Sequence, residues 1–375
     1  MKPFITFLLG LFCTVSYAQK AVVSVQNPLP LNRRDLVEIP ISQLKAKTGW
    51  EQMPSLIVRD ADGVEVPSQV THDGLLLVQS FIRPSETTTF SIEQGTPQTC
   101  SGKVCGRVHP DRLDDLAWEN DRNGWRLYGP GMRKGGAYGI DCFAKNRLEP
   151  VLDSLYRNDL VYHLSYHVNH GMGMDAYTVG PTLGAGAPAL MLGDSLLFAN
   201  VYDQVEILDN GPLRFTARLV YQHTDGIRET RLIQQDCGSH LVRCTVSYQG
   251  ENVPNRLATG LVIHTDNPRE FVINRRGRYI AYADNVGDPN TRNGQLFTAC
   301  LYPGTKGRMR YLPMAQEKSR AVGHVLTVVP YRAGEPFTYY FGSGWSQYDV
   351  PSMPVWETLL HDYQQQILHP LEISL

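Results

Sequence analysis

Histidines and an acidic residue gather around a glycine turn between residues 162 and 186. His167 and His170 precede a Gly-x-Gly turn, and Asp175 and Tyr177 follow it closely. A histidine held by an aspartate can act as an oriented general base, and a tyrosine can give or take a proton at a sugar carbon. We therefore predict that the catalytic residues are His167, His170, Asp175 and Tyr177.

The spacing of these histidines leaves two geometries open. Together with His163 they lie at i, i+4 and i+7, which would put all three on one face of a helix. On a strand, His170 would point away from the other two. Three histidines could also bind a metal ion, but we favour acid–base chemistry and predict neither a metal nor another cofactor. The nearby Gly180, Gly184 and Gly186 suit a loop that lets backbone approach a ligand.

A second segment, WENDRNGWRLYGP at residues 118–130, carries an unusual density of charged and aromatic residues. A strand here would place Asn120, Arg122, Arg126 and Tyr128 on one face. Arginine beside aromatic rings can hold a carboxylate and a sugar ring together. We predict that Arg122 binds a substrate carboxylate. The alternative is a salt bridge from Arg122 to Asp121 or Glu119 that serves only the fold.

Three further positions are scattered along the chain. Lys145 could supply positive charge, His264 ends a predicted strand, and Trp345 follows a glycine-rich turn and could stack on a ring. Each could equally belong to ordinary hairpin structure. The complete set of predicted substrate-binding residues is Arg122, Trp118, Asn120, Tyr128, Lys145, His264 and Trp345.

Short β-branched runs separated by turn residues dominate the first part of the chain. They predict a small β-sandwich over residues 19–95, followed by a linker over 96–106. The predicted strands are Ala21–Gln26, Leu36–Ile41, Ser55–Arg59, Val64–Thr71, Gly74–Ile82 and Thr87–Glu93.

Residues 107–375 form a longer region that is again mostly strand. Many antiparallel strands with few helices predict an all-β domain built as a large double-sheet sandwich, which would carry the site. Helices are expected only at Glu149–Leu160 and Met353–Leu368. The clearest strands are Val201–Leu208, Leu213–Gln222, Ile227–Gln235, His240–Tyr248, Arg256–His264, Gly323–Val329 and Phe337–Gly342.

The N-terminus has the pattern of a secretion signal. Lys2 precedes the apolar run Phe4–Cys13, and Ser16-Tyr17-Ala18 offers small residues for cleavage. We therefore expect residues 1–18 to be removed after Ala18 and the mature chain to be periplasmic or secreted. The apolar run is shorter than the roughly 20 residues that a spanning helix requires, so we predict no membrane insertion.

Composition narrows the classes of partner. Lys and Arg number 35 against 37 Asp and Glu, and no basic tract stands out, so we predict no nucleic-acid partner. Six cysteines would remain after cleavage, an even count that suits an oxidising compartment. Cys100 could bridge to Cys105 and Cys237 to Cys244, or all could be buried free thiols.

The same segments resemble a family of exported Bacteroidetes proteins of unknown function. That family occurs in polysaccharide-utilisation gene clusters, sometimes near or fused to unsaturated-uronyl hydrolases. The resemblance implies processing of uronate- or rhamnose-containing glycans, and a sandwich similar to those of galactose mutarotases and polysaccharide lyases. The motifs that carry it are Glu119-Asn120-Asp121-Arg122, Tyr128-Gly129-Pro130, Tyr166-His167-x-x-His170-Gly171 and Asp175-x-Tyr177-x-Val179-Gly180.

Two positions depart from the family pattern. Met172 stands where an acidic residue is common in the His-Gly-x-Gly turn, and the glycine-rich loop reads Gly-Ala-Gly-Ala from Gly184. These departures imply altered specificity or reduced activity if that acid is catalytic elsewhere.

Three functions remain open from the sequence. The first is an envelope enzyme that acts on an acidic oligosaccharide. In β-elimination, Arg122 or Lys145 would neutralise the carboxylate while His170 or Tyr177 takes the C5 proton. Hydrolysis would instead need two carboxylates, for which Glu119, Asp121 and Asp175 are available. The second is a sugar mutarotase or isomerase, and the third is a glycan-binding protein without catalysis.

Overall fold

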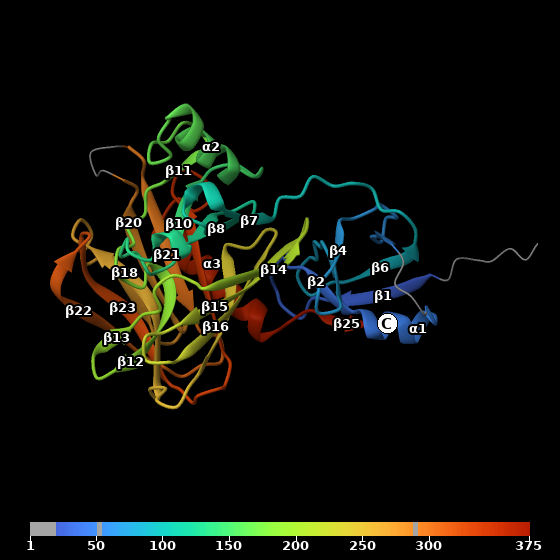
Figure 1. Cartoon of the computed structure of the whole chain (residues 1–375). Coiled ribbons are helices and arrows are strands. Elements are labelled where there is room, and N and C mark those ends of the chain that lie inside the picture. The colour runs from blue at the N-terminus through green and yellow to red at the C-terminus, as the bar shows by residue number, and fades with distance from the viewer. Residues whose placement is uncertain (1–19, 51–54, 288–291) are drawn as a thin grey trace, which may run out of the picture.

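A computed structural model describes residues 20–50, 55–287 and 292–375. The predicted signal peptide, residues 1–18, lies outside the described residues. The chain is mainly antiparallel β-structure arranged as a small and a large unit (Figure 1), which confirms the predicted fold class. No helix among the described residues has both the length and the apolar character needed to cross a bilayer.

The small unit packs two sheets and one helix, α1 (Ile41–Thr48), around its own apolar core. Val23, Ile39 and Val58 in that core are fully buried. One sheet has the order β25 (Glu372–Ser374), β1 (Ala21–Gln26), β6 (Thr87–Gln94) and β3 (Leu56–Arg59). The other has the order β2 (Val37–Pro40), β5 (Leu75–Val78) and β4 (Ser68–Val70).

Two features of the small unit differ from the sequence prediction. β25, which was assigned to the large domain, pairs antiparallel with β1. The strand predicted to run through Ile41 stops at Pro40, where helix α1 begins. Apolar or buried residues recur there at Ile41, Leu44 and Thr48, which is helical spacing, and Gly49 ends the helix with φ of +71°.

Residues 95–104 contain no strand, and Cys105 already belongs to the first strand of the large unit. The division of the chain at residues 96–106 stays a prediction. All six cysteines among the described residues are unpaired. The Cys100–Cys105 and Cys237–Cys244 bridges are therefore absent from this structure.

The large unit contains three sheets. The widest has the order β14 (Gln204–Asn210), β15 (Arg214–Gln222), β16 (Arg228–Asp236), β17 (Leu241–Gln249), β24 (Phe337–Trp345), β21 (Gln295–Leu301), β20 (Tyr279–Asn285) and β19 (Phe271–Asn274). The second has the order β13 (Ser195–Leu197), β12 (Ala185–Leu192), β18 (Arg256–His264), β23 (Ala321–Pro330) and β22 (Arg308–Lys318). The third has the order β11 (Gly173–Asp175), β10 (Asp141–Lys145), β9 (Gly124–Leu127), β8 (Asp115–Glu119) and β7 (Cys105–His109).

The eight-stranded sheet has two differently covered faces. Its inner face packs against both five-stranded sheets: Trp118 stacks on Phe215, and Trp125 meets Phe341 edge-on. Its outer face is covered by helix α3 (Met353–Leu368) through Trp356 and other apolar residues. Helix α2 (Leu152–Tyr162) packs against β8 and β10, and two short 3₁₀ turns occupy Pro110–Arg112 and Pro130–Met132.

Candidate functional site

A cleft of about 860 Å³ lies where the two units meet, a size typical of ligand sites. One wall is the 32–36 loop of the small unit, and the floor is the outer face of β16, β17 and β24. Helix α3 and the segment that follows it close the opposite wall. We call this the junction cleft. Its polar lining includes Arg122, His240, Asp349 and Tyr363.

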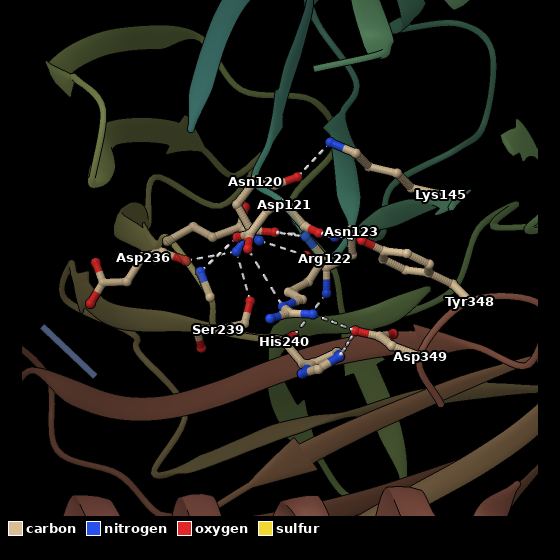
Figure 2. A network of polar contacts seen from close by, with 12 residues as sticks. Asn120, Asp121, Arg122, Asn123, Lys145, Asp236, Ser239, His240, Tyr348 and Asp349 are labelled. Carbon is tan, nitrogen blue, oxygen red and sulfur yellow. Dashed lines mark hydrogen bonds and ion pairs between the residues drawn. The ribbon is translucent and has the colours of Figure 1, made fainter. Parts of the chain in front are cut away.

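The β8–β9 hairpin turn, residues 120–123, delivers Arg122 to this cleft (Figure 2). Asn120 Oδ1 accepts hydrogen bonds from the backbone N–H of Arg122, at 2.8 Å, and of Asn123, at 3.1 Å. This side-chain-closed turn is why the predicted continuous strand through 118–130 is wrong. Because the turn breaks the alternation, Arg122 and Tyr128 do not share a strand face.

The same turn fixes the position of His240. The Asn120 amide donates to the carbonyls of Asp236 and Ser239, at 2.6 and 2.7 Å, and the Asn123 amide donates to the His240 carbonyl at 2.9 Å. Asp121 accepts from the backbone N–H of Gly238 at 2.6 Å. The hairpin is thus bound to the β16–β17 turn, and Arg122 and His240 are held on neighbouring loops (Figure 2).

Arg122 and His240 both contact one carboxylate, that of Asp349. Arg122 Nη1 lies 2.9 Å and His240 Nε2 lies 3.0 Å from Asp349 Oδ2. Asp121 lies 3.6 Å from Arg122 Nε. Although burial alone would raise the pKa of Asp349, the His240 hydrogen bond and the Arg122 charge lower it below its usual value. Burial would lower the pKa of Arg122, but Asp121 and Asp349 raise it, so Arg122 stays charged.

Tyr363 on α3 completes a chain of polar contacts with His240. The backbone N–H of His240 donates to the Tyr363 hydroxyl at 2.9 Å, and that hydroxyl lies 3.0 Å from His240 Nδ1. With the Nε2–H bound to Asp349, Nδ1 is the acceptor for the tyrosine hydroxyl, a tautomer assigned from the network. Burial raises the pKa of Tyr363 to about 12. The arrangement can pass a proton from Tyr363 to His240 while Asp349 balances the imidazolium charge.

Lys145 and Glu119 lie beside this network but are enclosed. Lys145 Nζ lies 2.6 Å from Glu119 and 2.5 Å from the Asn120 carbonyl, and its side chain is fully buried. Glu119 also accepts the backbone N–H groups of Val151 and Leu152 at the start of α2. These contacts fix the hairpin and the helix, so Lys145 is a structural cation in this arrangement.

Asp175 and Tyr128 meet in a separate buried cluster around Arg126. Arg126 pairs with Asp141 and, at 2.6 Å, with Asp175, while the Tyr128 hydroxyl donates to Asp141 at 2.8 Å. Asp115 lies 4.0 Å from Arg126. Burial raises the pKa values of Asp141 and Asp115 to about 6, against the lowering effect of Arg126. This cluster therefore contains three carboxyl groups but only one guanidinium group to neutralise them.

The predicted histidines do not lie on one helix or strand. His163 ends α2 with φ of +54°, and the residues up to 172 form turns. His167 is exposed, with Nδ1 2.8 Å from the Asp175 carbonyl, and the exposed His170 has Nε2 3.1 Å from the Ser165 carbonyl. Among residues 20–50, 55–287 and 292–375, no three His, Cys, Asp or Glu side chains are arranged to hold a metal ion.

Tyr177 and His264 meet in the interior. Their rings are 5.6 Å apart, and His264 lies 2.7 Å from Asp284 and 2.8 Å from the Thr178 carbonyl. Burial raises the pKa of Tyr177 well above its usual value. Both side chains are almost completely inaccessible, so this pair supports the glycine-rich loop rather than an open site.

A family model described as "Domain of unknown function (DUF4861)" matches residues 25–373. The match covers nearly all of the residues described above. This chain belongs to the DUF4861 family.

Three other proteins resemble this DUF4861 chain, with sequence identities of 26% or less. Uncharacterized protein P7 of Formosa agariphila is 26% identical over 392 residues, which cover 97% of this chain and 95% of P7. An alpha-mannosidase from Enterococcus faecalis V583 has a TM-score of 0.51 and 9% identity, over 95% of this chain and 46% of that one. A glycosyl hydrolase family 38 protein from Enterococcus faecalis has a TM-score of 0.52 and 9% identity, over 95% and 47%.

The DUF4861 chain thus spans slightly less than half the length of these two solved structures. At 9% identity the likeness concerns the fold alone.

Of the predicted site residues, the DUF4861 fold places only Arg122 on the junction cleft. His167 and Asp175 are neighbours of each other, and neither of them lines the junction cleft. Trp118 and Trp345 are core residues with at most 2% exposure, and the Trp345 indole donates to the Asn293 carbonyl. A catalytic or binding role for the separated residues stays a prediction.

The sequence prediction missed His240, Asp349 and Tyr363. Tyr363 falls on the same helical face as the buried Trp356 and Leu360, at spacings of four and three residues. A polar group on an apolar helix face was therefore visible as a signal. His240 and Asp349 follow turns and show no comparable pattern.

Proposed function

We propose that this DUF4861 protein is a carbohydrate-active enzyme that binds an acidic oligosaccharide in the junction cleft and transfers a proton through Tyr363 and His240. The observation that carries the proposal is the Tyr363–His240–Asp349 contact chain, at 3.0 Å per step, beside Arg122 on a large open cleft. The fold shared with proteins titled as an alpha-mannosidase and a family 38 glycosyl hydrolase supports a carbohydrate as substrate. A uronate fits the arginines of the cleft, and the family resemblance implies a uronate- or rhamnose-containing chain.

The favoured reaction is β-elimination. Tyr363 passes its proton to His240 Nδ1, and the resulting phenolate removes the C5 proton of a uronate. The electron pair of that C–H bond forms the C4–C5 double bond as the C4–O bond breaks. The imidazolium of His240 then protonates the departing oxygen, so both residues return to their starting states. Arg122 offsets negative charge that develops on the uronate carboxylate.

Product analysis separates this reaction from its alternatives. The protein is incubated with acidic oligosaccharides while the absorbance of a 4,5-unsaturated uronate and the number of reducing ends are followed. New absorbance identifies a lyase, and new reducing ends without it identify a hydrolase. Faster anomer equilibration alone identifies a mutarotase, and binding without any of these identifies a glycan-binding protein.

Tyr363→Phe tests the residue that starts the proton transfer. Because it removes only the hydroxyl, we expect the rate to fall by about 100-fold or more. The control is His361→Gln, which changes an exposed side chain on the same helix and should leave the rate unchanged. An unaltered rate in Tyr363→Phe, with the thermal unfolding temperature of each variant checked, contradicts the proposal.

We extend the proposal to location: the predicted signal peptide places the mature chain in the periplasm or outside the cell. Sequencing the N-terminus of protein recovered from those fractions tests cleavage after Ala18.

A further inference from the structure

The arginines of the junction cleft differ in whether a carboxylate already neutralises them. Arg214 pairs with Asp236 at 2.6 Å and with Glu38 at 2.5 Å. Arg33 pairs with Asp35 and donates to the His369 carbonyl at 2.9 Å. Arg122 is likewise paired with Asp349, through Nη1 alone, so each of these arginines has a carboxylate partner within the protein.

Arg34 has no carboxylate partner, but its guanidinium lies over the Phe81 ring, 4.9 Å from the ring centroid. Arg243 has no carboxylate partner either. It lines the junction cleft and is exposed, and no Asp or Glu among the described residues forms a salt bridge with it. It projects from the outer face of β17, the face that carries Leu241 beneath α3. A guanidinium without a carboxylate partner on the cleft floor is free to bind an anion.

The neighbours of Arg243 suit a sugar ring. In the sheet register, Arg243 lies opposite Tyr340 on β24 and opposite Gln234 on β16, and both line the cleft. Tyr340 offers a flat ring with a polar edge. Gln234 offers both a hydrogen-bond donor and an acceptor. Directly opposed residues on adjacent strands share one face at close range.

The position of Arg243 separates it from the proton-transfer residues. His240 precedes β17 by one residue, so Arg243 lies three residues, or roughly 10 Å, further along the strand. A ligand anion at Arg243 therefore belongs to a different sugar from the one that faces His240 and Tyr363.

We propose that Arg243, Tyr340 and Gln234 form a subsite for an anionic sugar next to the reacting one. The placing of this subsite next to the reacting sugar rests on the proposed function. The subsite deepens that function because it names the class of sugar that the cleft binds. The ligand is a sugar that carries a carboxylate or a sulfate, since the guanidinium fork pairs with either planar or tetrahedral oxyanions.

The test is binding of three tetrasaccharides to the full chain: tetragalacturonate, its carboxyl-reduced neutral form, and a sulfated galactan tetramer. We expect Arg243→Gln to weaken binding of the preferred anionic tetramer by about 10- to 100-fold and to leave the neutral one unchanged. Which anionic tetramer binds more tightly distinguishes carboxylate from sulfate. Arg243→Lys should restore part of the affinity. The control is Arg218→Gln, an exposed arginine of the same sheet that pairs with Glu206.

Steady-state kinetics distinguish the anionic subsite at Arg243 from the proposed proton transfer through Tyr363. Arg243→Gln should raise KM for an acidic substrate with kcat nearly unchanged, whereas Tyr363→Phe should lower kcat. The subsite is overturned if Arg243→Gln weakens neutral and anionic tetramers equally, or if the wild-type protein binds all three alike. If anionic binding depends on Arg243 but no tetramer is turned over, the subsite stands and the proposed reaction fails.

Discussion

Arg122 forms ion pairs with both Asp349 and Asp121, and these two pairs determine how a ligand can bind to its guanidinium. Its Nη1 is bound to Asp349, while its Nε has no hydrogen-bond partner. The guanidinium is one-quarter exposed. A substrate carboxylate can therefore reach the fork only beside Asp349, which keeps the arginine oriented.

Arg122→Lys tests that orientation. A lysine keeps the positive charge near Asp349 but loses the planar fork. We expect the affinity for acidic oligosaccharides to drop about tenfold, with the thermal unfolding temperature nearly unchanged. If unfolding is clearly destabilised, and neutral and acidic sugars are affected equally, Arg122 serves only the fold.

The buried carboxyl group of Asp115 should make the stability of the fold depend on pH. Burial raises the pKa of Asp115 to about 6 in the folded protein, so folding favours the protonated, uncharged carboxyl group. The stability that this neutral form contributes is fully present below the unfolded pKa of about 4. That contribution is lost as the pH rises through 6. We expect Asp115→Asn to raise the free energy of unfolding at pH 7.5 by on the order of 1–3 kcal/mol, with little effect near pH 4.

Urea unfolding at several pH values measures this change. Asp111→Asn, at an exposed position on the preceding turn, is the matched control and should have little effect at any pH. A stability gain for Asp115→Asn that does not vary with pH would mean that packing, not charge burial, causes it.

Single residues were only partly predictable from the sequence. The alternative of a salt bridge from Arg122 to Asp121 is confirmed at 3.6 Å, but the closer partner of Arg122, Asp349, was not foreseen. Asp349 is more than two hundred residues away in the chain, and local patterns carry no information on such contacts. Asn123-Gly124 was a readable hairpin signal, and it would have corrected the strand predicted through Trp118–Pro130.

At the scale of elements, helix α2 depends on a carboxylate from another strand. Its N-cap residue, Val151, has no capping side chain, and Glu119 of β8 accepts the first N–H groups in its place. Glu119 also neutralises the buried Lys145. One side chain therefore caps α2 and closes the β8–β9 hairpin that presents Arg122.

We expect Glu119→Ala to destabilise the fold by roughly 3–5 kcal/mol, because it leaves Lys145 buried without a counter-ion. Asp153→Ala is the control, since it breaks the exposed pair with Arg107 and should cost less than about 1 kcal/mol. Chemical denaturation of both variants measures the difference. Equal losses would show that Lys145 finds another partner.

Elements with strong periodicity were predicted well. Met353–Leu368 and Arg256–His264 match α3 and β18, because an apolar helix face and a buried strand leave clear patterns. The predicted helix Glu149–Leu160 instead starts at Leu152, after Pro150. The histidine segment had no single period, and the structure forms turns there, with Tyr166 packed edge-on against Phe143 of β10.

At the scale of the whole molecule, the junction cleft depends on the chain crossing between the units twice. After α3, Pro370 and Leu371 line the cleft and lead into β25, which pairs with β1. Ile373 packs against the core of the small unit. Pairing between the first and last strands cannot be read from local sequence, which is why β25 was assigned to the wrong unit.

Removal of residues 372–375 tests the importance of this strand. We expect faster amide hydrogen exchange in β1 and faster proteolysis of the small unit, while exchange in β15–β17 stays unchanged. Glu372→Gln, an exposed change within β25, should leave both rates as they are. Unchanged exchange in β1 after truncation would show that the small unit does not need its fourth strand.

The pairing of β25 with β1 also sets the order in which a growing chain can complete its structure. A ribosome makes β1 first and β25 last, so one edge of β1 stays open while every other strand is synthesised. Open edges are where foreign strands add and aggregation begins. The unit whose strands are made first is thus completed only when β25 emerges, and until then the β1 edge is open to pairing with other strands.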